Sequence, residues 1–172
     1  MGISLDPEIT AVELAGRIRA QARVPLQGTI EPTFRCNLRC VHCYVNEPVS
    51  APELSADEVP LERLLQLIDE IVASGTLTLL LTGGEVLVRP DFPELYRYAH
   101  SKGLLITIFT NGTMVTDRIA DLFVEHRPDW IEISLYGMTR ETYERVTQVP
   151  GSYDKCIAGI RRLMDRGLPV KL

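Results

Sequence analysis

The sequence lacks both an excess of positive charge and a hydrophobic run of membrane-spanning length. Its 172 residues carry a net charge of −5, and no run of like charges is longer than the pair Arg161–Arg162. A chain that neutralises many phosphates would be basic, so nucleic acid is not expected as a partner. The apolar stretch 77–81, with Thr78 inside it, is far too short to span a bilayer, so no membrane association is expected.

The N-terminal segment lacks the features of a targeting signal. Residues 1–28 contain no uninterrupted apolar core of the kind found in a signal peptide. Asp6 stands where a myristoylation signal needs Ser or Thr. We therefore expect a soluble, cytoplasmic protein. In that reducing compartment, the four cysteines are expected to be ligands or nucleophiles rather than members of disulfides.

Apolar residues follow strand spacing and helix spacing in strict alternation along the chain. Strands are predicted at residues 28–34, 77–82, 104–110 and 130–135, with a fifth at 168–172. Helices are predicted at 60–75, 91–103, 116–128, after 139 and at 152–167, and a further amphipathic helix at 7–22. The apolar runs lack clean alternation, which is typical of strands buried on both faces. This order predicts an α/β fold with a parallel sheet, either doubly wound or closed into a barrel.

The pattern stops within the predicted fifth strand. A complete eightfold barrel needs about 250 residues, and this chain supplies four complete strand–helix units. We therefore expect an incomplete copy of a larger fold, in which strand four lacks a neighbour. An exposed strand edge pairs readily with other chains, so self-association through the unpaired edge of the sheet is also expected.

Three polar residues mark details of the predicted helices. Asp91 with Glu94 predicts a capping box at the start of helix 91–103. Thr116 is the predicted N-cap of the next helix. Cys156 lies on the apolar stripe of the last helix and is interpreted as a small core residue rather than a ligand.

The unusual clusters of the chain all follow predicted strands. In parallel α/β folds, ligands bind at the carboxyl ends of the strands, in the connecting loops. After the four complete strands come, in order, a cysteine loop at 36–43, the segment Gly83–Gly84–Glu85, the pair Asn111–Gly112 and the segment 134–136. The sequence therefore places one candidate site on one rim of the sheet.

The cysteine loop is the most specific signal, because Cys36, Cys40 and Cys43 have the spacing C-x3-C-x2-C. Three thiolates within eight residues suit soft iron or zinc. A structural zinc site would need a fourth ligand, and the local candidate, His42, is strained by its adjacency to Cys43. An iron–sulfur cube held by three cysteines leaves one iron open for substrate or cofactor. Redox-active or spare thiols are the third alternative.

This loop, followed by Tyr44, resembles the signature of the radical S-adenosylmethionine (radical SAM) enzymes, with His42 where an aromatic residue usually precedes the last cysteine. Segments 81–85, 109–112 and 133–135 resemble the segments after that family's second, third and fourth strands. The likeness covers about residues 27–172 and is greatest to the branch with a C-terminal extension for auxiliary clusters (the SPASM group). Residues 1–26 are interpreted as a helical extension ahead of this core.

The resemblance implies a partial (β/α)6 barrel, incomplete here after the fourth βα unit, that binds a [4Fe-4S] cluster and S-adenosylmethionine. The cluster ligands would be Cys36, Cys40 and Cys43. The Gly-Gly-Glu segment would contact the methionine amino group, and the third- and fourth-strand segments would contact ribose and carboxylate. The implied cofactor-binding residues are His42, Gly83, Gly84, Glu85, Thr110, Asn111 and Ser134.

The chemistry that the family implies begins with one electron from an external donor. The reduced cluster cleaves S-adenosylmethionine to methionine and a 5'-deoxyadenosyl radical, which abstracts hydrogen from a substrate. The substrate is not specified by the sequence, although the extended branch often modifies peptides, and the expected role is in peptide or cofactor maturation. Two residues depart from the family pattern: Val86 replaces a usual proline, and Tyr136 stands where many members have aspartate, which bears on substrate choice.

Other interpretations of these residues remain open at the level of sequence. Gly83–Gly84 is also compatible with a plain turn, Glu85 with a solvated carboxylate, and Ser134 with a hydrogen-bonded core hydroxyl. Asn111–Gly112 is a hairpin signal, but a helix is predicted to follow it, so a hairpin is not expected. The alternative function is a non-catalytic, zinc-stabilised binding module that uses the cysteine loop.

Overall fold

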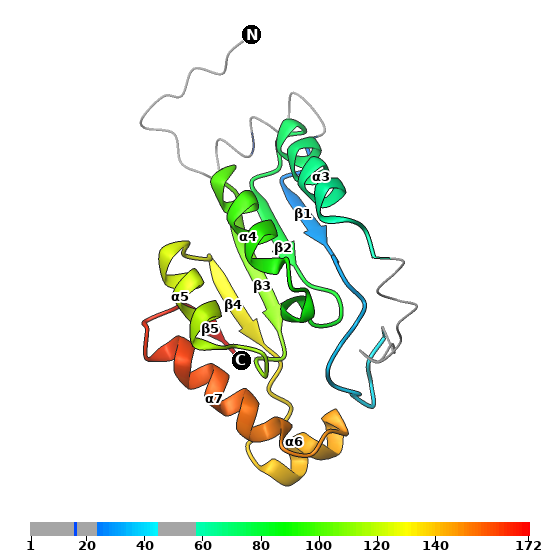
Figure 1. Cartoon of the computed structure of the whole chain (residues 1–172), viewed down its shortest axis with the longest axis vertical. Coiled ribbons are helices and arrows are strands. Elements are labelled where there is room, and N and C mark those ends of the chain that lie inside the picture. Colours follow the sequence, from blue (N-terminus) through cyan, green and yellow to red (C-terminus); the bar gives the residue numbers. More distant parts are fainter. Residues whose placement is uncertain (1–15, 17–23, 45–57) are drawn as a thin grey trace.

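The computed structural model describes Gly16 and residues 24–44 and 58–172 (Figure 1). In chain order the elements are β1 (Gln27–Ile30), α3 (Leu61–Ala73), β2 (Thr78–Leu81), the 3-10 helix η1 (Val86–Val88), α4 (Phe92–Ser101), β3 (Leu105–Thr110), α5 (Asp117–Glu125), β4 (Trp130–Ile133), α6 (Arg140–Thr147), α7 (Ser152–Met164) and β5 (Val170–Lys171). The helix predicted at residues 7–22 lies outside the described residues apart from Gly16.

The five strands form one parallel sheet in the order β1-β2-β3-β4-β5. Each strand pairs with the next one along the chain, and a helical connection joins each consecutive pair. The predicted α/β fold with a parallel sheet is therefore confirmed, and the sheet is open rather than closed into a complete barrel.

Only one face of the sheet is covered by helices among the described residues. Figure 1 shows α3, α4, α5 and α7 side by side along the sheet. The strand residues that point toward these helices are 5% exposed or less: Ile30, Leu79, Leu81, Ile106, Ile108, Ile131 and Ile133. The alternate residues of the strands are half-buried or exposed, among them Leu105 at 56% and Trp130 at 39%. The prediction that the strands are buried on both faces is wrong, because large apolar residues also occupy the open face.

Three further details differ from the sequence-based expectations. The first strand ends at Ile30 rather than at 34, because Pro32 has no N–H with which to extend a ladder. Asp91 precedes α4 without a side-chain capping bond, since its carboxylate pairs with the guanidinium of Arg89 instead. Strand β4 does have a neighbour, because Val170 of β5 pairs with Ile131.

The other helix ends agree with the predictions. Thr116 Oγ1 accepts a hydrogen bond from the N–H of Ile119 and caps α5. Thr139, after which a short helix was predicted without an assigned cap, caps α6 in the same way through the N–H of Thr142. Cys156 is fully buried in the core, as predicted. In the part of the chain that is described, no helix has the length and apolar character needed to cross a membrane.

Candidate functional site

The carboxyl ends of the strands meet at one rim, where the predicted clusters converge. Figure 1 shows the segment after β1 and helix α6 at this end of the sheet. A cavity of about 500 Å³ opens here. Its walls include nine of the ten residues singled out in the sequence: Cys36, Cys40, His42, Cys43, Gly83, Gly84, Thr110, Asn111 and Ser134. The parallel arrangement of the strands thus brings these nine residues, from Cys36 to Ser134, into one pocket.

The cysteine loop is held against helix α6 by main-chain hydrogen bonds. The N–H of Arg39 donates to the carbonyl of Thr147 at 3.0 Å, and the N–H of Val41 donates to that of Val146 at 2.9 Å. Within the loop, the N–H of Cys43 donates to the carbonyl of Cys40 at 3.0 Å and closes a turn. The end of α6 therefore supplies acceptors that fix the middle of a loop without regular structure of its own.

The three thiols of the loop differ in their surroundings. Burial raises the pKa of the Cys36 thiol and raises the pKa of Cys40 to about 11. Against burial, the N–H of Leu38 at 3.4 Å and the side-chain amide of Asn111 at 3.7 Å donate to the Cys36 sulfur and favour its thiolate. Within residues 24–44 and 58–172, no three His, Cys, Asp or Glu side chains converge tightly enough to hold a single metal ion.

Gly83 and Gly84 serve two different purposes. Gly83 has a φ of +120°, a conformation that favours glycine and fits a turn. Gly84 lies against the cysteine loop, since its N–H donates to the carbonyl of Thr33 at 2.9 Å. A Cβ atom at Gly84 would overlap the carbonyl oxygens of Phe34 and Arg35. The backbone of this segment can therefore approach the base of the cysteine loop only because residue 84 is glycine.

Glu85 lies behind the cavity wall rather than in it. Its side chain is fully buried, so the interpretation as a solvated carboxylate is wrong. The carboxylate accepts hydrogen bonds from Thr110 Oγ1 at 2.7 Å, from the N–H of Asn111 at 2.7 Å and from the N–H of Leu87 at 3.1 Å. Burial raises the pKa of Glu85, while these donors favour its charged form. Glu85 thereby joins the loop after β2 to the loop after β3.

Asn111 connects this buried carboxylate to the cysteine loop. Its side-chain amide donates to Asn37 Oδ1 at 2.8 Å as well as to the Cys36 sulfur. Its Oδ1 accepts from the hydroxyl of Thr113 at 2.6 Å. The pair Asn111–Gly112 leads into α5 and not into a returning strand, in agreement with the sequence-based exclusion of a hairpin.

The remaining predicted residues, His42 and Ser134, also line the cavity. His42 is exposed, and its ring packs edge-on against Tyr136 with 4.8 Å between ring centroids. Ser134 is half-buried at the carboxyl end of β4, and its N–H donates to the carbonyl of Thr110 at 3.1 Å. Burial raises the pKa of the Tyr136 hydroxyl. Tyr136, the departure noted in the sequence, is therefore part of the cavity wall.

Two charged residues that support the site were missed by the sequence analysis. Arg89 is 5% exposed and donates to the carbonyl of Pro32 at 2.9 Å, at the base of the cysteine loop. Glu58 accepts from Arg35 at 2.8 and 3.0 Å, and Arg89 lies 3.5 Å from the same carboxylate. No motif marks these residues, because the contacts that tie them to the cysteine loop, from Arg89 to Pro32 and from Glu58 to Arg35, join segments far apart in the sequence.

Comparisons with known proteins match most of the chain to one family. The profile described as "Radical SAM superfamily" matches residues 30–172. The chain is 34% identical over 142 residues, 83% of its length, to the AdoMet-dependent heme synthase of Methanosarcina barkeri (strain Fusaro / DSM 804). It is 32% identical over 150 residues, 87% of its length, to the antilisterial bacteriocin subtilosin biosynthesis protein AlbA of Bacillus subtilis (strain 168). The matches span only 40% and 33% of those two proteins.

The fold has counterparts among solved structures. Streptococcus suis SuiB bound to its precursor peptide SuiA superposes with a TM-score of 0.75 at 17% identity, over 99% of this chain and 40% of SuiB. The complex of SuiB with S-adenosylmethionine gives a TM-score of 0.74 over 92% of this chain and 36% of SuiB.

Proposed function

Because this chain belongs to the radical SAM superfamily, we propose that it binds a [4Fe-4S] cluster and S-adenosylmethionine in the cavity at the carboxyl ends of its strands. The observation that carries the proposal is the convergence of Cys36, Cys40 and Cys43 with Gly84 and Asn111 on one cavity. The chain spans 40% or less of the first relatives described above. Because so much of the relatives' length is not matched, the catalytic activity stated below is also a proposal.

The donor set fits an iron–sulfur cluster. Three thiols line the cavity, and the amide donors at Cys36 are of the kind that stabilise a thiolate ligand. The loop that bears them is fixed by α6 and by the Gly84 segment. In this proposal, Cys36, Cys40 and Cys43 would each hold one iron of the cluster, and the fourth iron would have no protein ligand.

The same cavity offers groups suited to the polar parts of S-adenosylmethionine. The backbone at Gly83 and Gly84 lines one wall and would receive the methionine amino group, as the family resemblance implies. Thr110, Asn111 and Ser134 also line the cavity and would contact the ribose and carboxylate. His42 packs against Tyr136 at the mouth, where it would cover the bound cofactor. Glu85 would act through Asn111 and Thr110, as a positioning residue.

When bound, the cluster and S-adenosylmethionine supply a reductive cleavage that yields methionine and a 5'-deoxyadenosyl radical for hydrogen abstraction. The chain's own contribution is to orient the cofactor and exclude water from the reacting atoms. The partly buried thiols and the apolar rings of Phe109 and Tyr136 in the cavity wall suit that purpose.

We propose a peptide as the substrate class. Two relatives support this choice: the subtilosin biosynthesis protein AlbA and the PqqA peptide cyclase of Ruegeria pomeroyi, which is 33% identical over 148 residues. SuiB, whose structure is similar, was solved with a precursor peptide. In this chain the open face of the sheet continues from the cavity wall at Phe109 toward Trp130, and both side chains are more than one third exposed. The exposed Glu132 pairs with Phe109, and the Lys171 ammonium lies 3.8 Å from the centroid of the Trp130 ring. A surface of aromatic and charged side chains of this kind suits the mixed side chains of a peptide.

The setting of the reaction also belongs to the proposal. The four cysteines are free, and three of them are the proposed cluster ligands. Because thiols stay reduced in the cytoplasm, we propose that compartment for the protein. An external one-electron donor is required by the proposed chemistry. Self-association through a sheet edge, and the division into residues 1–26 and 27–172, stay predictions.

Anaerobic reconstitution with iron and sulfide, followed by metal analysis and product analysis, tests the function. We expect about four irons and four sulfides per chain, and 5'-deoxyadenosine when S-adenosylmethionine and a strong chemical reductant are added. A colourless protein with one zinc per chain would instead support the zinc-stabilised binding module and contradict the proposal.

A further inference from the structure

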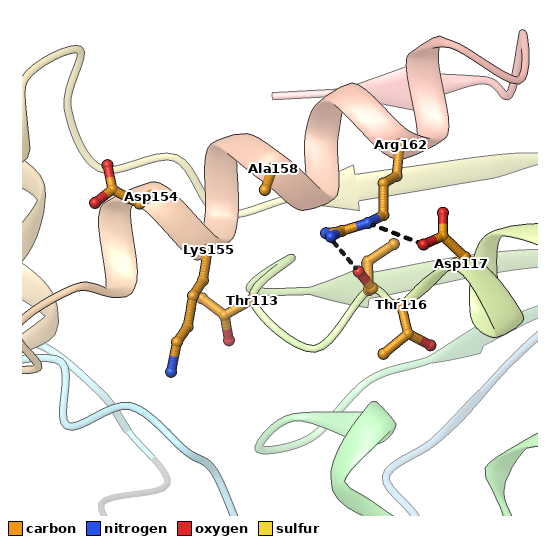
Figure 2. A pocket seen from close by; sticks show the side chains of 8 residues that line it. Thr113, Thr116, Asp117, Asp154, Lys155, Ala158 and Arg162 are labelled. Carbon is orange, nitrogen blue, oxygen red and sulfur yellow. Dashed lines mark hydrogen bonds and ion pairs between the residues drawn. The ribbon is translucent and has the colours of Figure 1, made fainter.

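A second cavity, of about 530 Å³, lies between the start of α5 and the outer face of α7 (Figure 2). We name it the α7 pocket and define it by Thr113 and Asp117 on one side and Lys155 and Arg162 on the other. None of these four residues lines the cysteine cavity. The α7 pocket is therefore separate from the proposed cofactor site, and none of its lining residues was assigned a part in binding the cluster or S-adenosylmethionine.

The two cavities share a wall, formed by the turn from Asn111 to Thr113. Thr113 lines the α7 pocket, and its hydroxyl donates to Asn111 Oδ1 at 2.6 Å. The amide nitrogen of the same Asn111 side chain lies 3.7 Å from the Cys36 sulfur. A single side-chain amide thus separates Thr113 from a proposed cluster ligand, so the Thr113 oxygen and the Cys36 sulfur are at most about 9 Å apart.

A second connection runs along the same path. The side-chain amide of Asn37 donates to Thr113 Oγ1 at 2.7 Å, and Asn37 is covalently joined to Cys36. Hydrogen bonds and covalent bonds therefore link the α7 pocket to the cysteine loop without a solvent gap. An electron that enters at the wall of the α7 pocket would therefore have a short path through bonded groups to the Cys36 sulfur.

Among the described residues, the ion pairs of the α7 pocket leave one cation, Lys155, without an ion-pair partner. Asp117 is paired with Arg166 at 2.9 Å and with Arg162 at 3.7 Å. The remaining carboxylate of the pocket, Asp154, is paired with Arg140 at 2.6 Å. Lys155 is exposed, and Figure 2 shows its ammonium without a partner among the residues of the pocket. The net charge of the chain is −5, so most of its surface would repel an acidic protein. The unpaired ammonium of Lys155 would attract an acidic protein to this pocket.

We propose that the α7 pocket, with Lys155 as its charged contact, is the docking surface for the one-electron donor, a small electron-carrier protein with an acidic face. The inference rests on the proposed function, because it needs a cluster at Cys36, Cys40 and Cys43. One electron leaves the reduced flavin or iron–sulfur centre of the donor and is taken up by the oxidised cluster. No bond forms or breaks on this chain. The substrate is excluded as the occupant, because it must reach the cofactor in the other cavity.

The test compares two charge reversals on the same helix in the reconstituted protein. Lys155→Glu changes the pocket, whereas Arg161→Glu makes the same change at an exposed position of α7 that does not line it. The probes are purified flavodoxin hydroquinone and, separately, a reduced [4Fe-4S] ferredoxin. Two quantities are measured: the affinity of each carrier by calorimetry, and the rate of cluster reduction by stopped-flow absorbance. Dithionite, which needs no docking surface, serves as the reference reductant.

For Lys155→Glu we expect carrier affinity and carrier-driven reduction to fall about tenfold at low salt, with a smaller loss at high salt. Reduction by dithionite should be unchanged, and Arg161→Glu should behave like the wild type. An equal effect of both reversals, no effect of Lys155→Glu, or no binding of either carrier to the wild type would overturn the docking site. Loss of dithionite-driven 5'-deoxyadenosine formation in the wild type would instead overturn the proposed function.

Discussion

The side-chain amide of Asn111 lies 3.7 Å from the sulfur of Cys36, although 75 residues separate the two in sequence. The contact exists because β1 and β3 lie on either side of β2, and their carboxyl ends therefore open onto the same rim. Glu85, in the loop after β2, holds the backbone of Asn111 from behind. Three consecutive strand-end loops are thus coupled at the proposed cluster site.

The ligand assignment predicts a division among the four cysteines. Replacing Cys36, Cys40 or Cys43 with alanine should nearly abolish iron binding, because two thiolates do not retain the cluster against exchange. Cys156→Ala should leave the iron content unchanged and lower the free energy of unfolding by about 1–2 kcal/mol, since the buried sulfur fills the core. Iron and sulfide analysis after reconstitution, with chemical denaturation, measures both effects. Loss of iron in Cys156→Ala together with its retention in Cys40→Ala would refute the assignment.

Gly84 is expected to be intolerant of any side chain. In Gly84→Ala, the new methyl group meets the carbonyl oxygens of Phe34 and Arg35, so the base of the cysteine loop must shift. Overpacking of this kind costs about 1–3 kcal/mol, and both cluster content and S-adenosylmethionine affinity should fall. Gly28→Ala is the matched control, because its Cβ would make ordinary contacts, the nearest at 3.5 Å. Equal cofactor affinity in the two variants would reduce Gly84 to an ordinary turn residue.

Glu85 should impose a pH dependence on the stability of the cofactor-free protein. Burial raises its pKa above the usual value of 4.5, so the folded state binds more protons than the unfolded state from that pH up to the folded-state pKa. The contribution of Glu85 to the free energy of unfolding is therefore largest below pH 4.5, and it is lost as pH rises through the folded-state pKa. Glu85→Gln removes the ionisation and should remove this fall. Urea denaturation of both proteins over a pH series gives the difference, and parallel curves would contradict it.

Arg89 is predicted to be the structural support of the cysteine loop. Arg89→Met leaves the carbonyl of Pro32 and the carboxylate of Asp91 without their donor, at a cost of about 2–4 kcal/mol in the free energy of unfolding. The same substitution at Arg63, which pairs with Glu70 on the exposed surface of α3, should lower the stability much less, because solvent screens an exposed ion pair. Thermal denaturation of both variants decides the matter, and an equal loss at the two positions would show that Arg89 has no special structural role.

Much of the fold could be predicted because its signals are local. Thr116 caps the helix that it precedes, as its position in the sequence indicated. The hydrophobic periodicity located all five strands to within a few residues. The first strand was predicted to end at residue 34, because the prediction did not take into account that Pro32 cannot extend the ladder. Local reasoning failed at Asp91, whose side chain could either cap α4 or pair with Arg89, and the ion pair prevailed. It also failed for Glu85, because nothing in the neighbouring residues shows that Thr110 and Asn111 donate to its carboxylate.

The sequence by itself determined the order of strands and helices, the parallel α/β class and the three-cysteine loop, because hydrophobic period, helix caps and ligand spacing are properties of short segments. Only the tertiary structure decided that Glu85 is buried, that Arg89 supports the loop and that Thr113 links a second pocket to Cys36. These relationships join residues up to 76 positions apart. They depend on strand register and on which face each side chain occupies, and a short stretch of sequence encodes neither.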